Sequence, residues 1–388
     1  MYPAEEATPV KQTKRLVWFL TIVLSLSLVA AACGDSDDSS SDDGGATTTA
    51  AGDSGSDSGS MAGTLIGAGA SSQKAAMDAW KAGFQTANPD VTVNYDPIGS
   101  GGGREQFLSG ATMFAGSDAY LDEEELAAAV DRCPGERGAI NLPHYISPVA
   151  AAFNLPGIET LNMTPATLAG IFAETITNWN DAAIAADNPG VELPDLAINP
   201  VHRSDKSGTS ENFTDYLAAA APDVWTFGPI EEWPGDLGGE GADGTSGVVA
   251  AITAGEGSIG YADASQVAGL GAVAIKVGNE FVAFTPEAAG RIVDVSEVVA
   301  GRGEFDFAIE VNRTTEEAGV YPVALVSYHI VCLDYPTQEE ADLVKAFMTY
   351  IGSAEGQATS SEFAGSAPIS DEFRQRLAVA IDAIGVAG

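Results

Sequence analysis

Short strand patterns alternate with helical patterns from residue 64 onward, and this alternation restricts the fold more than any other feature of the chain. Strands are expected at 64–67, 91–95 and 113–115, and helices at 71–87, from 104 and at 122–130. Because strands separated by helices pair in parallel, this order predicts an α/β fold in which helices cover a mostly parallel sheet. Ligands in such folds bind beyond the carboxyl ends of the strands, where loops meet helix starts.

A second alternating pattern begins after Pro143. Strands are expected at 146–154, 197–201, 258–261 and 323–333, and helices at 165–172, 208–220, 248–254 and 341–351. The start of the helix after Thr164 has the clearest signal, because threonine caps helices and Pro165 suits the first helical position. No internal repeat with a fixed period is found.

The chain is strongly acidic and long enough for about two domains. It has 388 residues, and 17 Lys and Arg stand against 55 Asp and Glu, which gives a formal net charge of −38. Such a chain lacks the basic face that binds the phosphates of nucleic acid. Nine of the acids and three of the bases precede residue 62, so residues 62–388 carry about −32. An anion site in this part must therefore use local donors against long-range repulsion.

The first 61 residues read as an export signal followed by a tether. Three basic residues precede an apolar stretch at 16–32 that ends in small residues before Cys33. This pattern indicates a secretory signal, and it resembles the signal of bacterial lipoproteins, in which the cysteine is lipidated and becomes the new N-terminus. The alternative is an uncleaved membrane anchor, for which 17 residues is short. Residues 33–61 are mostly Asp, Ser, Gly, Thr and Ala, which predicts a disordered acidic tether.

Three loops share one design, in which a strand ends, small or hydroxyl residues follow, and a helix starts. They are Gly69-Ala70-Ser71-Ser72, Gly99-Ser100-Gly101-Gly102 and Ser207-Gly208-Thr209. A helix start offers unpaired N–H groups and a positive dipole end to an anion, and serine or threonine adds a hydroxyl donor. Each loop alone is equally typical of an ordinary helix cap.

A cation and an acceptor accompany these loops. Arg203 follows an expected strand, and a guanidinium fork suits tetrahedral oxyanions. Asp205 is close enough in sequence to brace it, although a surface Arg–Asp pair is the common alternative. Asp118 follows the third expected strand and is a candidate acceptor, with a turn cap as its alternative role.

Motifs for other chemistry are missing or out of context. The chain has neither a G-x-x-x-x-G-K-[ST] phosphate loop nor a G-x-S-x-G elbow. The three histidines lie singly, and cysteines and histidines show no zinc spacing, so no metal or cofactor is expected. Two glycine sets, at 239, 241 and 244 and at 255, 257 and 260, have dinucleotide-fingerprint spacing. Neither follows an expected strand and opens an expected helix, so we do not interpret them as nucleotide sites.

Several motifs together resemble the phosphate-binding lipoproteins of bacterial ABC importers, the PstS family. They are Gly67-Ala68-Gly69-Ala70-Ser71, Gly99-Ser100-Gly101, Ala115-Gly116-Ser117-Asp118, Ile176-Thr177-Asn178-Trp179-Asn180-Asp181, Asn188-Pro189-Gly190, Leu193-Pro194, Arg203-Ser204-Asp205-Lys206-Ser207-Gly208-Thr209-Ser210, Ser258-Ile259-Gly260-Tyr261 and Tyr321-Pro322. The resemblance implies that the ligand contacts are Ser71, Ser72, Ser100, Asp118, Arg203, Ser207, Gly208 and Thr209, with Asp205 behind Arg203. Ser72 stands where the family often has an aromatic residue, and Gly101 where it often has a second serine.

The resemblance also implies a two-lobed periplasmic-binding-protein clamp. Lobe 1 is expected to comprise 62–146 plus 329–388, and lobe 2 to comprise 147–328. The chain would then cross between the lobes near Ile146 and near His329.

The implied function is capture of inorganic phosphate and its delivery to the permease subunits of an ABC importer. The protein would be a monomer without enzymatic activity, lipid-anchored outside the cytoplasmic membrane. A binding protein for sulfate or molybdate, a secreted phosphatase and a purely adhesive lipoprotein are the alternatives. A phosphatase would need a metal cluster or an activated nucleophile, and the sequence indicates neither.

The two remaining cysteines, Cys133 and Cys332, are expected to form a disulfide. An exported protein meets an oxidising compartment, and lipidation of Cys33 leaves an even pair. The resemblance implies that both belong to lobe 1. Two buried free thiols are the alternative.

Overall fold

The computed structural model describes residues 61–388, so the predicted signal peptide, Cys33 and nearly all of the predicted tether lie outside the described residues. The strands are β1 (Gly63–Gly69), β2 (Val91–Asp96), β3 (Phe114–Ser117), β4 (Ala139–Phe153), β5 (Thr160–Met163), β6 (Asn199–Arg203), β7 (Glu240–Ala242), β8 (Ser258–Asp263), β9 (Gly271–Val277), β10 (Glu280–Val282), β11 (Glu297–Val298), β12 (Ile309–Glu310), β13 (Ala324–Cys332), β14 (Asp334–Tyr335) and β15 (Gly385–Val386). The helices are α1 (Lys74–Ala87), α2 (Ser100–Leu108), α3 (Glu123–Arg132), α4 (Pro165–Phe172), α5 (Ala182–Asp187), α6 (Gly208–Ala220), α7 (Gly244–Ala254), α8 (Pro286–Asp294), α9 (Gln338–Gly352), α10 (Ala354–Ala364) and α11 (Asp371–Asp382), with a short 3₁₀ turn η1 (Ala264–Gln266).

The main sheet has the strand order β2-β1-β3-β13-β4-β8-β6-β7, and β9 joins it through β4. Strand β1 pairs in parallel with β2 and β3, and β6 pairs in parallel with β8, as the alternating pattern predicts. Strand β6 also pairs in parallel with β7, a strand that was not expected. Strands β13 and β4 are the exception, because they run antiparallel to each other and to their neighbours β3 and β8. The sheet is therefore mixed, with parallel pairs on both sides of an antiparallel centre.

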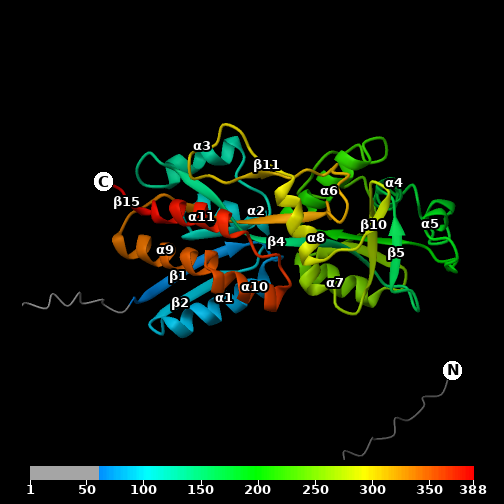
Figure 1. The fold of residues 1–388 in the computed structure, drawn as a ribbon, viewed down its shortest axis with the longest axis horizontal. Coiled ribbons are helices and arrows are strands. Elements are labelled where there is room, and N and C mark those ends of the chain that lie inside the picture. Colours follow the sequence, from blue (N-terminus) through cyan, green and yellow to red (C-terminus); the bar gives the residue numbers. More distant parts are fainter. Residues whose placement is uncertain (1–60) are drawn as a thin grey trace, which may run out of the picture. The chain divides into compact units, whose positions relative to one another are not determined.

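The antiparallel centre connects two halves of the molecule. Strand β4 pairs with β13 from Ala139 to Pro148 and then with β8 from Val149 to Phe153. In Figure 1 the first and last parts of the chain, with α1, α9, α10 and α11, lie around one end of the sheet, and the middle part, with α4, α5 and α7, lies around the other. Ile146 pairs with Val326, three residues before His329. Strand β4 therefore changes its pairing partner close to Ile146, where the first crossing is expected. The residue of β13 that faces Ile146 lies slightly before His329, where the second crossing is expected.

Local capping signals explain where most helices begin. Thr164 caps α4 through its side chain, and Pro165 occupies the first helical position as expected. Asp122 and Glu125 form a reciprocal capping box at the start of α3. The side chain of Ser207 caps α6.

Four of the expected helix starts were placed wrongly by three or four residues. Helix α7 begins at Gly244 and not at 248, and α9 begins at Gln338 and not at 341. Helix α2 begins at Ser100 and not at Arg104, because only Gly99, with φ of 90°, breaks the chain and the next three glycines are helical. Helix α1 begins at Lys74, after a turn that contains Ser71 and Ser72.

The structure agrees with the rejection of the two glycine sets as nucleotide sites. Gly239 precedes β7, Gly241 lies within it and only Gly244 opens a helix, so this set forms no loop between a strand and a helix. Gly255, Gly257 and Gly260 instead follow α7 and lead into β8. Strand β7 itself was not expected, because a three-residue, mostly exposed segment has no strand pattern.

The core is continuous through the sheet, with β4 and β13 buried along their whole length. A disulfide joins Cys133, at the end of α3, to Cys332, at the end of β13, with Cα atoms 5.5 Å apart. Within residues 61–388, no helix is both long enough and apolar enough to cross a membrane.

Candidate anion-binding site

The carboxylate of Asp118 lies directly after β3 and is 3% exposed. Its Oδ1 accepts hydrogen bonds from Ser72 Oγ at 2.7 Å and Ser327 Oγ at 2.5 Å. Its Oδ2 accepts from Ser72 Oγ at 2.8 Å and Thr209 Oγ1 at 2.8 Å. A buried charge needs such partners, because desolvation without them costs several kcal/mol, on the order of the whole stability margin. Four segments that are distant in sequence therefore meet at this one acid.

The loop that begins at Gly99 packs against the loop that precedes α6. Ser100 Oγ accepts the backbone N–H of Asp118 at 3.0 Å. A β-carbon at Gly208 would lie only 2.8 Å from this same Oγ, so the two helix starts are in close contact. A β-carbon at Gly99 would collide with Oδ2 of Asp205 and lie 3.5 Å from Nη2 of Arg203. Glycine at 99 thus meets both a steric and a backbone requirement.

Arg203, at the end of β6, is 2% exposed and is held by Asp205. Its Nε donates to Oδ1 of Asp205 at 2.6 Å, and its Nη2 donates to Oδ2. Burial alone would raise the pKa of Asp205, but the hydrogen bonds and charge of Arg203 outweigh it and lower this pKa. The pairing fixes the guanidinium plane, and Nη1 has no hydrogen-bond partner among residues 61–388.

The start of α7 is a fourth helix terminus at the site, and sequence reasoning missed it. The backbone N–H of Thr245 donates to Ser71 Oγ at 3.1 Å, and the two hydroxyls lie 3.1 Å apart. The N–H of Gly244 donates to Oδ1 of Asp205 at 3.1 Å. The signal that could have identified it is Gly244-Thr245-Ser246, a glycine and two hydroxyl residues of the same design as the three predicted loops.

The structure thus places all eight predicted contact residues in one buried cluster. All of them are less than 9% exposed, and Asp205 is half-buried behind Arg203. Sequence reasoning did not identify Thr245 and Ser327, which hydrogen bond to members of the cluster, or Gln73, which donates to Ser327.

An ion pair connects the two sides of the cluster. Arg104 on α2 donates from Nη2 to Glu231 Oε2 at 2.8 Å and from Nε to Glu125 Oε1 at 2.8 Å. Burial alone would lower the pKa of Arg104, but Glu231 and Glu125 raise it above its ordinary value. The Glu231 backbone carbonyl also accepts the N–H of Ser207 at 3.1 Å. Glu231 therefore joins α2 to the start of α6.

The surroundings of Asp118 are acidic. A cavity of about 700 Å³ borders it, and its lining includes Glu211, Asp215, Glu297 and Glu310. Burial, with Glu231 nearby, raises the pKa of Glu211 to about 7. These carboxylates do not favour an anion, so the hydroxyls, helix termini and Arg203 must supply the attraction locally.

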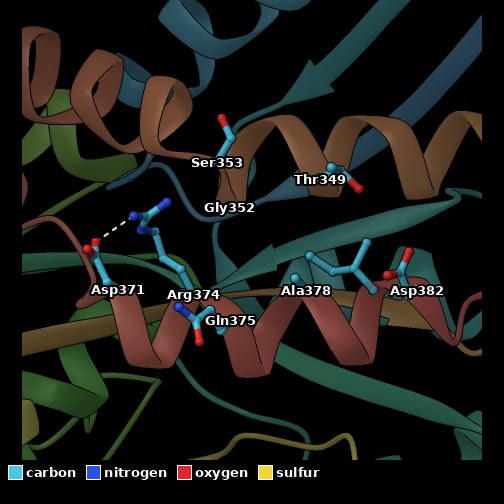
Figure 2. Close-up of a pocket in the computed structure, with 9 residues that line it drawn as sticks. Thr349, Gly352, Ser353, Asp371, Arg374, Gln375, Ala378 and Asp382 are labelled. Carbon is cyan, nitrogen blue, oxygen red and sulfur yellow. Dashed lines mark hydrogen bonds and ion pairs between the residues drawn. The ribbon is translucent and has the colours of Figure 1, made fainter.

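A second pocket, of about 350 Å³, lies away from this cluster between α9 and α11 (Figure 2). Its basic side chain, Arg374, points toward Asp371 and donates to it at 2.5 Å. None of the predicted contact residues lines it. Among residues 61–388, no group of three or more His, Cys, Asp or Glu side chains is arranged to hold a metal ion.

Comparison with known proteins identifies the family. A family model described as the PBP superfamily domain matches residues 46–355. Phosphate-binding protein PstS 3 from Mycobacterium tuberculosis is 37% identical over 328 residues, which cover 83% of this chain and 86% of that protein. The chain belongs to the PstS family. PstS 2 from the same organism is 36% identical over 330 residues, which cover 82% of this chain and 87% of that protein.

Solved structures agree with the PstS assignment at the level of fold. A high affinity periplasmic phosphate-binding protein (PfluDING) bound with phosphate superposes with a TM-score of 0.67 at 22% identity, over 82% of this chain and 93% of that one. A phosphate-binding protein from Stenotrophomonas maltophilia gives 0.62 at 19% identity, over 82% and 93%. The prediction of a two-lobed α/β fold is confirmed.

Proposed function

We propose that this PstS-family protein captures hydrogen phosphate between two lobes and delivers it to an ABC importer. The observation that carries the proposal is the cluster around Asp118 and Arg203. It combines one buried acceptor, one braced guanidinium and several helix starts rich in hydroxyl groups. This set matches an anion that has both negative oxygens and one remaining proton.

Each predicted contact has a role in this proposal. Arg203 donates to two phosphate oxygens. The N–H groups of Ser71, Ser72 and Ser100 and the hydroxyls of Ser71 and Ser100 donate from one side. The hydroxyl of Ser207 and the N–H groups of Gly208 and Thr209 donate from the start of α6. Asp118 accepts the proton of the phosphate.

The lobe division that we propose follows the sheet. Residues 62–146 and 329–388 form lobe 1, and residues 147–328 form lobe 2. The long strands β4 and β13 then act as the two crossings. Both lie in the antiparallel centre, where β13 pairs with β3 and β4, and β4 pairs with β13 and β8. Asp118 belongs to lobe 1, and Arg203 and Thr209 to lobe 2, so phosphate would hold the lobes together.

We propose binding without catalysis. The hydroxyls of Ser72 and Thr209 donate to Asp118, but in this proposal the acid accepts the phosphate proton, so it does not serve as a base that turns either hydroxyl into a nucleophile. Other tetrahedral oxyanions, sulfate and molybdate, are less suited than hydrogen phosphate because neither brings a proton to Asp118 near neutral pH.

Calorimetric titration of the purified protein with phosphate, sulfate and molybdate tests the proposal. We expect saturable 1:1 binding of phosphate with clear preference over the other two anions. Absence of phosphate binding, or a preference for sulfate, would contradict it.

The anchoring of the protein is part of the same proposal. We propose that Cys33 is lipidated and that residues 33–61 tether the lobes outside the cytoplasmic membrane, next to the permease subunits. Each buried methylene of an acyl chain contributes about 0.8 kcal/mol, so two or more chains give stable attachment. Cys33→Ala should yield a soluble or uncleaved protein that does not incorporate labelled palmitate. Palmitate labelling and unchanged size in that variant would refute the anchor.

A further inference from the structure

Ser327 lies beside Asp118 because of the register between β13 and β3. Tyr328 pairs in antiparallel fashion with Ser117, so the preceding residue, Ser327, stands opposite Asp118. The register between β13 and β4 shifts at the same point, but the extra residue, His144, is on β4. The Ser327 hydroxyl lies 2.5 Å from Oδ1 of the carboxylate.

Gln73 determines where the Ser327 proton points. Its Nε2 donates to Ser327 Oγ at 2.5 Å and to the backbone carbonyl of Tyr328 at 3.3 Å. A carbonyl oxygen only accepts, so the nitrogen of the amide must face this side. Ser327 Oγ then accepts from Gln73, and its single proton is left for Asp118. Both Gln73 and Ser327 are completely buried, so water does not compete for these bonds.

We infer that Gln73 and Ser327 form a relay that orients Asp118 and sets its preference for hydrogen phosphate over sulfate. The inference rests on the proposed function. The relay ties Oδ1 to Ser327 on the long strand β13. Ser72 bonds both oxygens, and Oδ2 also faces Thr209 on α6, where the ligand would lie. A carboxylate held this way meets the phosphate proton in a good hydrogen-bond direction. A carboxylate that can rotate loses this geometry, and hydrogen bonds weaken steeply with misalignment.

Gln73 and Ser327 are thus positioning residues. Comparing the affinities for phosphate and sulfate separates this role from a general structural one. Loss of the relay should weaken the bond that phosphate alone makes to Asp118. Sulfate makes no such bond, so its binding should not fall. A misfolded site would instead lose both anions together.

The test is calorimetric titration of the full chain with inorganic phosphate and with sulfate. Ser327→Ala should lower phosphate affinity about tenfold, as expected for one charge-assisted hydrogen bond, and leave sulfate affinity unchanged. Ser327→Thr keeps the hydroxyl and should restore the phosphate-to-sulfate ratio. Gln73→Met should reduce the ratio less, because the Ser327 hydroxyl remains but its proton is no longer directed.

Ser147→Ala is the matched control. Ser147 is a fully buried serine on the neighbouring strand β4 and has no hydrogen bond to Asp118 among the described residues. This variant should keep the wild-type ratio. An unchanged ratio in Ser327→Ala, or an equal loss of both anions, would overturn the relay while the wild-type preference for phosphate still stood. A wild-type protein that binds no phosphate would overturn the proposed function and the relay with it.

Discussion

The ion pair between Arg104 and Glu231 is not among the proposed phosphate contacts, but it should control the affinity for phosphate. Arg104 lies on α2 in the proposed lobe 1. Glu231 lies in the proposed lobe 2, where its backbone carbonyl accepts the N–H of Ser207. Because the pair joins the two proposed lobes, we expect it to form only when they are closed and so to stabilise the closed form in which phosphate would be enclosed. Glu231→Gln removes the charge and keeps the shape of the side chain.

The burial of the pair gives the magnitude. The side chains are 4% and 15% exposed, so solvent screens the pair little. A hydrogen bond to a charged group contributes about 1.5–3 kcal/mol, and a neutral one about half as much. Glu231→Gln should therefore destabilise the closed form by about 1–1.5 kcal/mol and weaken phosphate binding about five- to tenfold.

Glu125→Gln is the matched control, because Glu125 accepts from the same arginine at the same 2.8 Å but lies on α3 within lobe 1. The one amide oxygen of glutamine keeps the capping-box bond to the N–H of Asp122, so Glu125→Gln loses its bond to Arg104 without losing the cap. Both variants should lower the free energy of unfolding, measured by urea titration. Only Glu231→Gln should lower the phosphate affinity measured by calorimetry. An equal loss of affinity in both variants, or in neither, would refute the reasoning.

Three other results are expected. Asp118→Asn should weaken phosphate binding by about 1–3 kcal/mol and narrow the gap to sulfate, whereas Arg203→Ala should weaken both anions; a full phosphate preference in Asp118→Asn would refute the assignment of this residue. Thiol counting on the mature protein under denaturing, non-reducing conditions should find no free thiol. Replacing Cys133 and Cys332 by serine should lower the free energy of unfolding by up to about 4–5 kcal/mol, since the bridge closes a loop with a sequence separation of 199. Burial lowers the pKa of His144 to about 3, so the folded protein binds fewer protons there than the unfolded chain, and stability should fall as the pH drops from about 6.5 toward 3. In urea unfolding between these pH limits, His144→Gln should reduce the pH dependence of the free energy of unfolding by about 1.4 kcal/mol per pH unit. An unchanged pH dependence would contradict the lowered pKa of His144.

The sequence determined those parts of the site whose signals are local. A helix cap or a turn glycine acts within a few residues, so the loops around Ser71, Ser100 and Ser207 could be identified from residue type and spacing. Arg203 and Asp205 are two positions apart, and their pairing could be expected for the same reason. The alternation of strands and helices predicted the parallel pairs on either side of the sheet.

Only the tertiary structure decided which distant groups complete the site. Gln73 and Ser327 are 254 residues apart, and Ser327 lies beside Asp118 only because β13 pairs with β3, a pairing that no residue pattern announces. Thr245 reaches Ser71 over 174 residues because β7, three residues long, places α7 beside the first loop. The energy of a helix cap depends on residues within one turn of the chain, whereas the register of a strand depends on the summed energy of many cross-strand contacts. For that reason the sequence indicated the groups that could meet an anion, and packing alone decided how the acid among them is oriented.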